Sequence, residues 1–182
     1  MRNEVRNDSD PFGFAATELV GIVQIDGGAG NDVITGSAGA DILVGGSGSD
    51  KLKGGLGNDT YRIGRGDGID TLAENDATSG NMDVAEFLAG ITADQIWMRH
   101  VGNNLEASVI GTADKLIVEN WYLGNPYHVE QFRTSDGRQL LDSRVENLVQ
   151  AMAGFAPPAA GQTVLPQAYQ DALTPVIAAN WQ

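Results

Sequence analysis

The sequence predicts an all-β fold for the main body of the chain: a short parallel β-roll, then an antiparallel β-sheet or sandwich, then a C-terminal helical tail. Three observations support this prediction. Residues 27–62 repeat with a period of nine, and glycine thins out after residue 83, where apolar residues begin to alternate. Residues 144–154 then place their apolar side chains at the spacing of an amphipathic helix.

The repeat is a nonapeptide that occurs four times without insertion, with glycine at its first and fourth positions. The sixth position is always aspartate: Asp32, Asp41, Asp50 and Asp59. The eighth is apolar or aromatic: Ile34, Leu43, Leu52 and Tyr61. This pattern is typical of a calcium-binding parallel β-roll, in which each copy makes one turn and one short strand. Alternate copies then stack on the same side, about 4.8 Å apart.

The glycine-rich turns are expected to hold calcium. Glycine permits the sharp backbone bends, and these bends leave carbonyl groups that need a partner. A hard cation surrounded by oxygen atoms is such a partner, and aspartate adds charge. Residues 66–72 read as a fifth turn whose aspartate is Asp70, shifted in phase by two extra residues. The predicted ligands are Gly27, Ala29, Asp32, Gly36, Ala38, Asp41, Gly45, Gly46, Gly48, Asp50, Gly55, Gly57, Asp59, Gly66, Gly68 and Asp70.

Two other interpretations of this segment are less consistent with its pattern. A flexible Gly/Ser linker has no reason to place aspartate and an apolar residue in phase four times. A phosphate-binding loop would end in Gly-Lys-Ser or Gly-Lys-Thr, which is missing here, and its acidic side chains would repel phosphate. Glu74 and Asp76 could close the last calcium site, but a solvated loop is the simpler expectation for them.

The composition supports binding of cations. The 182 residues include 11 Lys and Arg against 24 Asp and Glu, a formal net charge of −13. This balance argues against nucleic acid or an anionic membrane surface as a partner. No cysteine is present, so disulfides and thiolate metal sites are excluded. No apolar run is long enough for a transmembrane segment, and the first ten residues have no apolar core of a cleavable signal peptide.

The chain divides into four expected parts: a lead-in at 1–20, the roll at 21–76, a second β domain at 77–141 and a helical tail at 142–182. The expected strands are 21–25 before the repeats, then 84–88, 95–101, 105–110, 115–119, 128–134 and 139–141. Helices are expected at about 144–154, capped by Asp142 or Ser143, and at about 167–179, interrupted near Pro175. A Pro- and Ala-rich linker at 155–166 suggests that the tail is separable from the sheet.

The nonapeptides resemble those of the repeats-in-toxin (RTX) family, found at the C-terminal ends of bacterial proteins exported by type I secretion. Residues 63–74 resemble the segment that follows such repeats, and 83–141 resemble the haemolysin-type calcium-binding related domain. The tail, with its Ala-Pro-Pro-Ala-Ala-Gly-Gln-Thr and Ala-Ala-Asn-Trp-Gln segments, resembles the C-terminal end of large proteins of this kind. The resemblance implies calcium as cofactor, the type I secretion machinery as partner, an extracellular location and an uncleaved secretion signal in the tail.

We therefore expect a non-catalytic, calcium-binding module of a larger exported toxin-like protein. The sequence contains neither of the hydrolase motifs His-Glu-x-x-His and Gly-x-Ser-x-Gly, and His100 and His128 are each expected to be a structural or surface histidine rather than a ligand. The alternative is a carbohydrate- or surface-binding adhesion module in which calcium is a scaffold. Its glycan platform would consist of the aromatic residues Trp97, Trp121, Tyr122 and Tyr127, although core packing is the commoner role of such residues.

Overall fold

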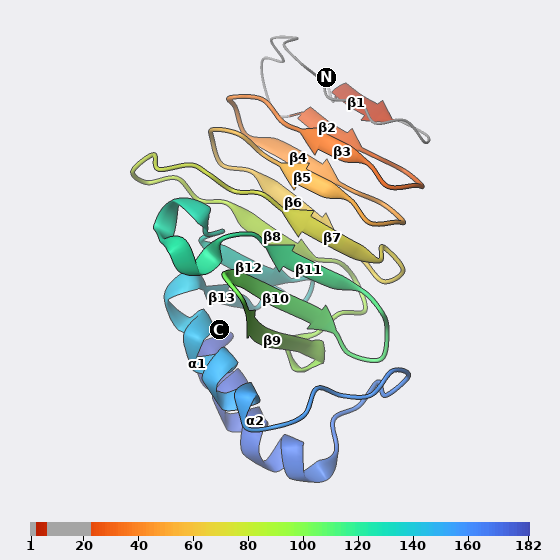
Figure 1. Ribbon diagram of the computed structural model, residues 1–182, viewed down its shortest axis with the longest axis vertical. Helices are drawn as coiled ribbons and strands as arrows, with labels where there is room; N and C mark the ends of the chain where they lie inside the picture. The colour runs from red at the N-terminus through yellow and green to blue at the C-terminus, as the bar shows by residue number, and fades with distance from the viewer. Residues whose placement is uncertain (1–2, 7–22) are drawn as a thin grey trace.

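The computed structural model describes residues 3–6 and 23–182, which form two sheets and two C-terminal helices. The first sheet has the strand order β1-β2-β4-β6-β8-β12-β13 and the second the order β3-β5-β7-β11-β10-β9. Figure 1 shows the roll at one end of an elongated molecule and the helices at the other. The sequence expectations for residues 1–2 and 7–22 lie outside the described residues.

The strands of the first sheet are β1 (Asn3–Arg6), β2 (Val23–Asp26), β4 (Asp41–Val44), β6 (Thr60–Ile63), β8 (Val84–Phe87), β12 (Gln131–Thr134) and β13 (Gln139–Leu141). Those of the second are β3 (Val33–Thr35), β5 (Lys51–Lys53), β7 (Ile69–Leu72), β9 (Ile96–Val101), β10 (Asn104–Val109) and β11 (Lys115–Val118). The main body is therefore built mostly from strands, as predicted.

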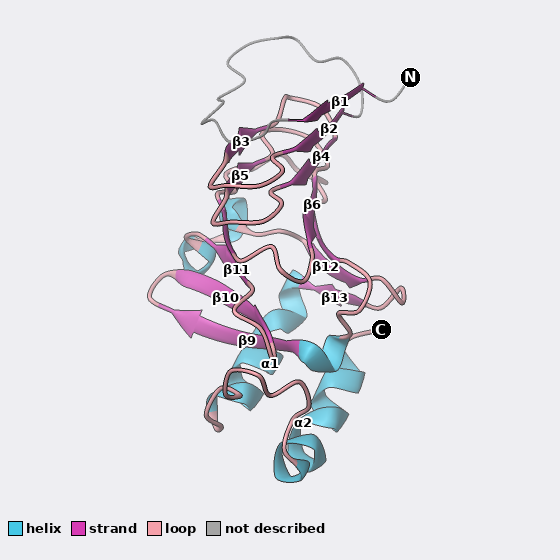
Figure 2. Ribbon diagram, turned by 90° about the vertical axis from the view of Figure 1, so that its right-hand side faces the viewer, coloured by secondary structure: helices cyan, strands magenta, loops and turns pink. Residues whose placement is uncertain are grey.

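Consecutive strands of the roll alternate between the two sheets, which face each other across the core (Figure 2). Each nonapeptide makes a turn and a strand, so strands two copies apart pair in parallel, as β4 does with β6 and β3 with β5. The eighth residue of each copy points inward, because side chains alternate along a strand. Leu43, Leu52 and Tyr61 are accordingly completely buried.

The sheets of the roll continue into the second half of the chain, which corrects the prediction of an added antiparallel sheet. β8 pairs in parallel with both β6 and β12, and β11 pairs in parallel with β7. Among the described strands, antiparallel pairing is limited to β9–β10–β11 and β12–β13. The reason is that the last strands of the roll have unpaired backbone N–H and C=O groups along one edge. The strands that follow form hydrogen bonds with these groups directly.

Helix α1 (Asp142–Ala153) packs against β9 and α2 (Gln167–Asn180), and its apolar stripe is buried. It begins at Asp142, two residues before the predicted start, and Leu141 occupies the capping position. Pro175 lies within α2 and does not interrupt it. The connections between later strands include the short 3-10 helices η1 (Ala93–Gln95), η2 (Trp121–Leu123) and η3 (Asn125–Tyr127).

The C-terminal residues pack into the core and are hydrogen-bonded to the first sheet. Trp181 is 2% exposed and belongs to the same core as the strands. The backbone of Gln182 exchanges two hydrogen bonds with Gln139 of β13, at 2.7 and 2.9 Å. This packing argues against the expectation that residues 142–182 are separable from the sheet.

Candidate metal sites

The glycine-rich turns stack in two columns, one on each side of the roll. On the first side, Ser47 N–H donates to Gly28 O and Gly30 N–H donates to Ser47 O, both at 2.8 Å. Gly48 N–H donates to the carbonyl of Asp67 at 2.7 Å, which joins the third turn to the fifth. The turns 27–32, 45–50 and 64–70 therefore form the first stack, and the turns 36–41 and 54–59 lie on the other side.

Close stacking explains why the turns need glycine. Gly46 has a φ of 94°, a region that L side chains rarely adopt, and a methyl group there would overlap the carbonyl oxygen of Gly28. The equivalent residue on the other side, Gly55, has a φ of 115° and faces the carbonyl oxygen of Ser37 in the same way. Only glycine allows neighbouring turns to approach so closely.

The aspartates at the sixth positions are joined along the first side. The backbone N–H of Asp32 donates to Oδ1 of Asp50 at 2.8 Å, and that of Asp50 donates to Oδ1 of Asp70 at 3.1 Å. We call Asp32, Asp50 and Asp70 column one. Asp70 thus occupies the next position of the column, although the segment between Asp50 and Asp70 is two residues longer than that between Asp32 and Asp50.

Column two, which we define as Asp41, Asp59 and Asp83, extends further than the sequence predicted. Asp41 N–H donates to Oδ1 of Asp59 at 2.8 Å, and Asp59 N–H donates to Oδ1 of Asp83 at 2.7 Å. Asp83 N–H in turn donates to Oε2 of Glu130 at 2.7 Å. Sequence reasoning missed Asp83 and Glu130. One signal could have found both, since each directly precedes a strand, as Asp32, Asp50 and Asp59 do.

The carboxylates of both columns are buried and incompletely hydrogen-bonded. All six aspartates are at most 4% exposed. Both side-chain oxygens of Asp32, Oδ1 of Asp41, and Oδ2 of Asp50 and Asp59 are buried without a hydrogen-bond partner. Among the described residues, no Lys or Arg lies within ion-pair distance of these aspartates. Because a buried charge without a partner is costly, the columns require compensation by a cation or by protons.

Burial also shifts the titration of these groups. It raises the pKa of Asp59 to about 7 and that of Asp70 to about 8, with further contributions from neighbouring carboxylates. The pKa values of Asp32 and Asp50 are raised mainly by burial as well. Removal from water disfavours the charged form, so in the metal-free folded chain Asp59 and Asp70 keep their protons to a higher pH than an exposed aspartate does.

The donor set fits a hard divalent cation such as calcium, which binds carboxylate and carbonyl oxygens. Within the described residues, no group of three or more acidic, histidine or cysteine side chains could hold a metal ion alone. Each nonapeptide turn contributes one aspartate, so backbone carbonyls would have to complete each oxygen shell. The predicted carbonyl donors, such as Gly27 and Ala29 beside Asp32, lie in the same turns as the aspartates. The carbonyl of Gly48 already accepts the N–H of Ile69 at 3.1 Å, which leaves one of its lone pairs for an ion.

The expectation that Glu74 and Asp76 belong to a solvated loop is wrong. Glu74 is 4% exposed and Asp76 is 7% exposed. The hydroxyl of Tyr61 donates to Oε1 of Glu74, and the backbone N–H of Gly57 donates to Oδ2 of Asp76 at 3.3 Å. Burial, together with the charges of Asp83 and Asp59, raises the pKa of Glu74 to about 9. Both residues therefore pack beneath the last nonapeptide turn.

The aromatic residues do not form an exposed platform. Trp97 and Trp121 are 2% and 4% exposed, and both belong to the core. His128 stacks on Trp121 with ring centroids 3.8 Å apart and lies within hydrogen-bond distance of its carbonyl. His100 is exposed and stacks on Tyr122. Of the four residues of the expected glycan platform, the two tryptophans are therefore core residues, whereas Tyr122 and Tyr127 are half-buried.

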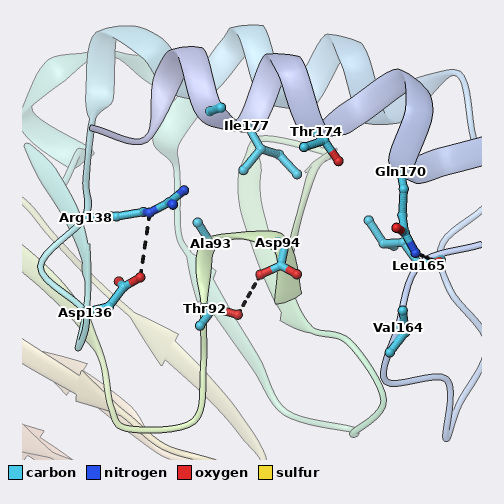
Figure 3. A pocket seen from close by; sticks show the side chains of 11 residues that line it. Thr92, Ala93, Asp94, Asp136, Arg138, Val164, Leu165, Gln170, Thr174 and Ile177 are labelled. Atoms are coloured by element: carbon cyan, nitrogen blue, oxygen red, sulfur yellow. Dashed lines mark hydrogen bonds and ion pairs between the residues drawn. The ribbon is translucent and has the colours of Figure 1, made fainter. Parts of the chain in front are cut away.

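A cleft of about 410 Å³ lies beside α2, and its lining includes no residue of the glycine-rich turns (Figure 3). Its charged groups satisfy one another or nearby hydroxyls: Arg138 pairs with Asp136 at 3.7 Å, and Thr92 Oγ1 donates to Asp94 at 2.6 Å. The lining residues include no histidine, cysteine or serine.

Comparison with known protein families gives two matches in separate parts of the chain. The RTX calcium-binding nonapeptide repeat, in four copies, matches residues 26–61 and 35–72. The haemolysin-type calcium binding protein related domain matches residues 104–143, which contain β10 to β13 and Glu130.

Proposed function

Because the chain carries RTX calcium-binding nonapeptide repeats and a haemolysin-type calcium binding protein related domain, we propose that it is a calcium-dependent folding module of an exported protein. Repeats of this family bind calcium. The ions are held by the aspartates of columns one and two and by the carbonyls of their turns. The observation that carries this proposal is the set of buried aspartate oxygens that have no hydrogen-bond partner.

The mechanism is a linkage between binding and folding. Without an ion, the chain must bury carboxylates that repel one another, which weakens the folded state. An ion that binds only the folded state stabilises it by RT ln(1 + [L]/Kd). Extracellular calcium modules commonly have Kd values of about 10⁻⁴–10⁻³ M. The module would therefore stay unfolded at cytosolic calcium levels, pass through a type I exporter, and fold in the medium.

The secreted location and the type I route are parts of the same proposal. None of the described helices has the length and apolar character needed to span a membrane. Export is tested by producing the chain together with a type I exporter and measuring it in the medium, with and without the exporter. Equal amounts in the medium without the exporter would contradict the route, while leaving calcium-dependent folding in place.

Circular dichroism tests the folding step directly. In a chelator, we expect the strand signal to fall and the fluorescence of Trp97, Trp121 and Trp181 to shift toward that of exposed indole. Millimolar calcium should restore both signals cooperatively, whereas magnesium should not, because it requires near-ideal octahedral geometry and retains its waters. A spectrum that is the same in chelator and in calcium would overturn the proposal.

A further inference from the structure

The second sheet ends in β9, which pairs with β10 on one side and with no other described strand on its outer side. Figure 2 shows β9 at this end of the sheet, next to α1. The last strand of the first sheet, β13, differs in this respect, because Gln182 exchanges two backbone hydrogen bonds with Gln139. The C-terminal residue thus covers one sheet edge, and the edge formed by β9 is left open.

Alternate residues of β9 direct their backbone groups toward the open side. The hairpin with β10 pairs Val101 with Asn104 across a two-residue turn, and such closing pairs are hydrogen-bonded. Hydrogen bonding then alternates along the strand, so the N–H and C=O groups of Met98 and His100 point away from β10. The N–H of Met98 agrees with this direction, since it donates to Sδ of Met152, a weak acceptor, at 3.1 Å. The backbone of His100 has no partner on this side within the part of the chain that the structure describes.

A groove of about 570 Å³ lies along the open edge. Residues 97–102 line it from β9 and the following turn. Val149, Met152, Phe155 and Pro157 line it from α1 and the segment after α1. Most of these side chains are apolar, and methionine adapts its shape to different partners. A strand that paired with β9 would therefore place alternate side chains against an apolar surface.

The charges at the groove favour an acidic partner. The described residues that line it include no Asp or Glu, although the whole chain has a net charge of −13. Arg99 lines the groove and shares one carboxylate, that of Glu106, with Lys115, at 3.3 Å each. The Nε of Arg99 is buried without a hydrogen-bond partner. One positive charge is thus in excess here, so a second copy of β9 would bring like charges together, whereas a carboxylate would complement Arg99.

We propose that the open edge of β9 binds an extended peptide segment in which apolar residues alternate with acidic ones. The peptide backbone pairs with His100 and Met98, its apolar side chains occupy the groove, and a carboxylate contacts Arg99. Pairing at Met98 requires Met152 to release the N–H, which a flexible thioether allows. Main-chain hydrogen bonds then supply affinity, and the groove and Arg99 supply specificity.

This peptide site is separate from the proposed calcium sites. Its lining includes no residue of the glycine-rich turns. β9 (Ile96–Val101) also lies between the two matched segments, 26–72 and 104–143, so neither family match includes it. Loss of peptide binding would therefore leave calcium-dependent folding in place, and the two proposals fail independently.

NMR titration of the unaltered full chain in millimolar calcium is the first test. The probe is a capped hexapeptide of alternating valine and glutamate, and the control peptide alternates valine and lysine. In about 0.15 M salt, which screens distant charges, we expect the glutamate peptide to shift the amide signals of residues 97–102 and to bind about tenfold more tightly. The acidic chain as a whole favours the lysine peptide, so this preference would report the local charge at Arg99. Unshifted signals, or equal binding of the two peptides, would overturn the inference.

A matched pair of variants tests the backbone pairing. His100→Pro and His100→Ala both remove the imidazole, but only proline removes the N–H on the open side. Proline is tolerated at such a position because it lies on an edge strand. We expect His100→Pro to bind the glutamate peptide about tenfold more weakly than His100→Ala does. Equal affinities would show that the peptide does not pair with β9.

A second pair of variants tests the charge and does not depend on the folding of His100→Pro. Arg99→Gln should weaken binding of the glutamate peptide about tenfold, whereas Lys53→Gln, which removes an exposed cation on β5 of the same sheet, should not. Equal affinities of these two variants would contradict the role of Arg99. Sedimentation of the unaltered chain tests the other occupant: a dimer that Arg99→Gln strengthens would assign the edge to a second copy and overturn the peptide site.

Discussion

The backbone N–H of Asp50 donates to Oδ1 of Asp70 across 3.1 Å, although these residues are 20 positions apart and Asp32 and Asp50 are only 18 apart. The longer turn 64–70 absorbs the difference, so Asp50 has a carboxylate neighbour on both sides. Asp32 has such a neighbour on one side among the described residues. In the proposed calcium-bound state, this arrangement ranks the aspartates by the number of ions that each one would touch.

We predict that Asp50→Ala raises the calcium concentration at the folding midpoint on the order of tenfold, and more than Asp32→Ala does. In the proposed calcium-bound state, Asp50 would lie between two ions, whereas Asp32 would touch one. Losing a ligand contribution of about 1.4 kcal/mol corresponds to a factor of ten in the binding constant. The midpoint is measured by calcium titration followed by circular dichroism. Asp171→Ala, on the exposed face of α2, is the control and should leave the midpoint unchanged. Equal midpoints for the Asp32 and Asp50 variants would contradict the ranking.

Column two leads to a prediction that the sequence alone does not make. The repeat pattern treats Asp41 and Asp59 as equivalent ends of a column that holds one ion. The structure places Asp83 beyond Asp59, so Asp59 occupies a middle position, as Asp50 does. Asp59→Ala should therefore shift the calcium midpoint more than Asp41→Ala, in the same titration. Identical midpoints would indicate that Asp83 takes no part in binding.

The sequence predicts the two columns of aspartates but not the position of Asp83, and this difference has a physical origin. The columns follow from a strict local period, because Gly and Asp repeat in phase with the turn and determine which copies stack. Asp83 comes 24 residues after Asp59, in a loop without the glycine pattern, so no period points to it. Its position depends on β8 joining β6 in parallel, which is a long-range choice between possible strand partners.

The same reasoning applies to the second half of the chain. Alternating apolar residues and the turn at 102–104 correctly indicated the β9–β10 hairpin, because both signals are local. The parallel pairing of β11 with β7 could not be predicted, since a short strand of either direction shows the same alternation. The burial of Glu74 was missed for a related reason. Acidic residues are normally exposed, and only the hydrogen bond from Tyr61 to Glu74 in the folded chain reveals that Glu74 is buried.

A matched pair of glycine variants tests the stacking of the turns. Gly46 and Gly80 both have positive φ, 94° and 85°, but a methyl group on Gly46 meets the carbonyl of Gly28, whereas nothing lies near Gly80. Both substitutions by alanine carry a conformational cost of about 1 kcal/mol. Only Gly46→Ala should also separate the turns and weaken calcium binding, which isothermal titration would detect. If the two variants bind calcium equally, crowding between the turns is unimportant.

Acid should substitute in part for calcium. Burial raises the pKa of Asp59 to about 7, of Asp70 to about 8 and of Glu74 to about 9, whereas Asp and Glu in an unfolded chain titrate near about 4. Between about pH 4 and 9 the folded, metal-free chain thus binds more protons than the unfolded chain, so its free energy of unfolding falls as pH rises. Glu86 has the opposite effect, because Arg62 and Arg133 lower its pKa despite burial. Its contribution to the free energy of unfolding is lost only as the pH falls to the acid end of this range.

The measurement is circular dichroism in chelator across this range. We expect more strand signal at pH 5 than at pH 8. In millimolar calcium the trend should weaken or reverse, because the ion competes with protons for the same carboxylates. A strand signal in chelator that is constant or increases from pH 5 to pH 8 would contradict the raised pKa values.

The C-terminal residues should be essential for folding. Trp181 is almost completely buried, and Gln182 is hydrogen-bonded to the edge of β13. Trp181→Ala is expected to lower the free energy of unfolding in calcium by about 3–5 kcal/mol, since it leaves a large cavity. Val164→Ala is the control: its side chain is 65% exposed, so the change should stay within about 0.5 kcal/mol. Urea unfolding in saturating calcium measures both values.

Truncation after residue 141 extends this prediction to the whole tail. It would remove Val145, Leu148 and Met152, which are at most 2% exposed and pack into the core shared with the strands. The exposed apolar surface of β9 should then prevent cooperative folding at any calcium concentration. A truncated chain that folds with the calcium midpoint of the full chain would show that α1 and α2 are dispensable. In that case the tail could be tested for a secretion signal apart from the fold.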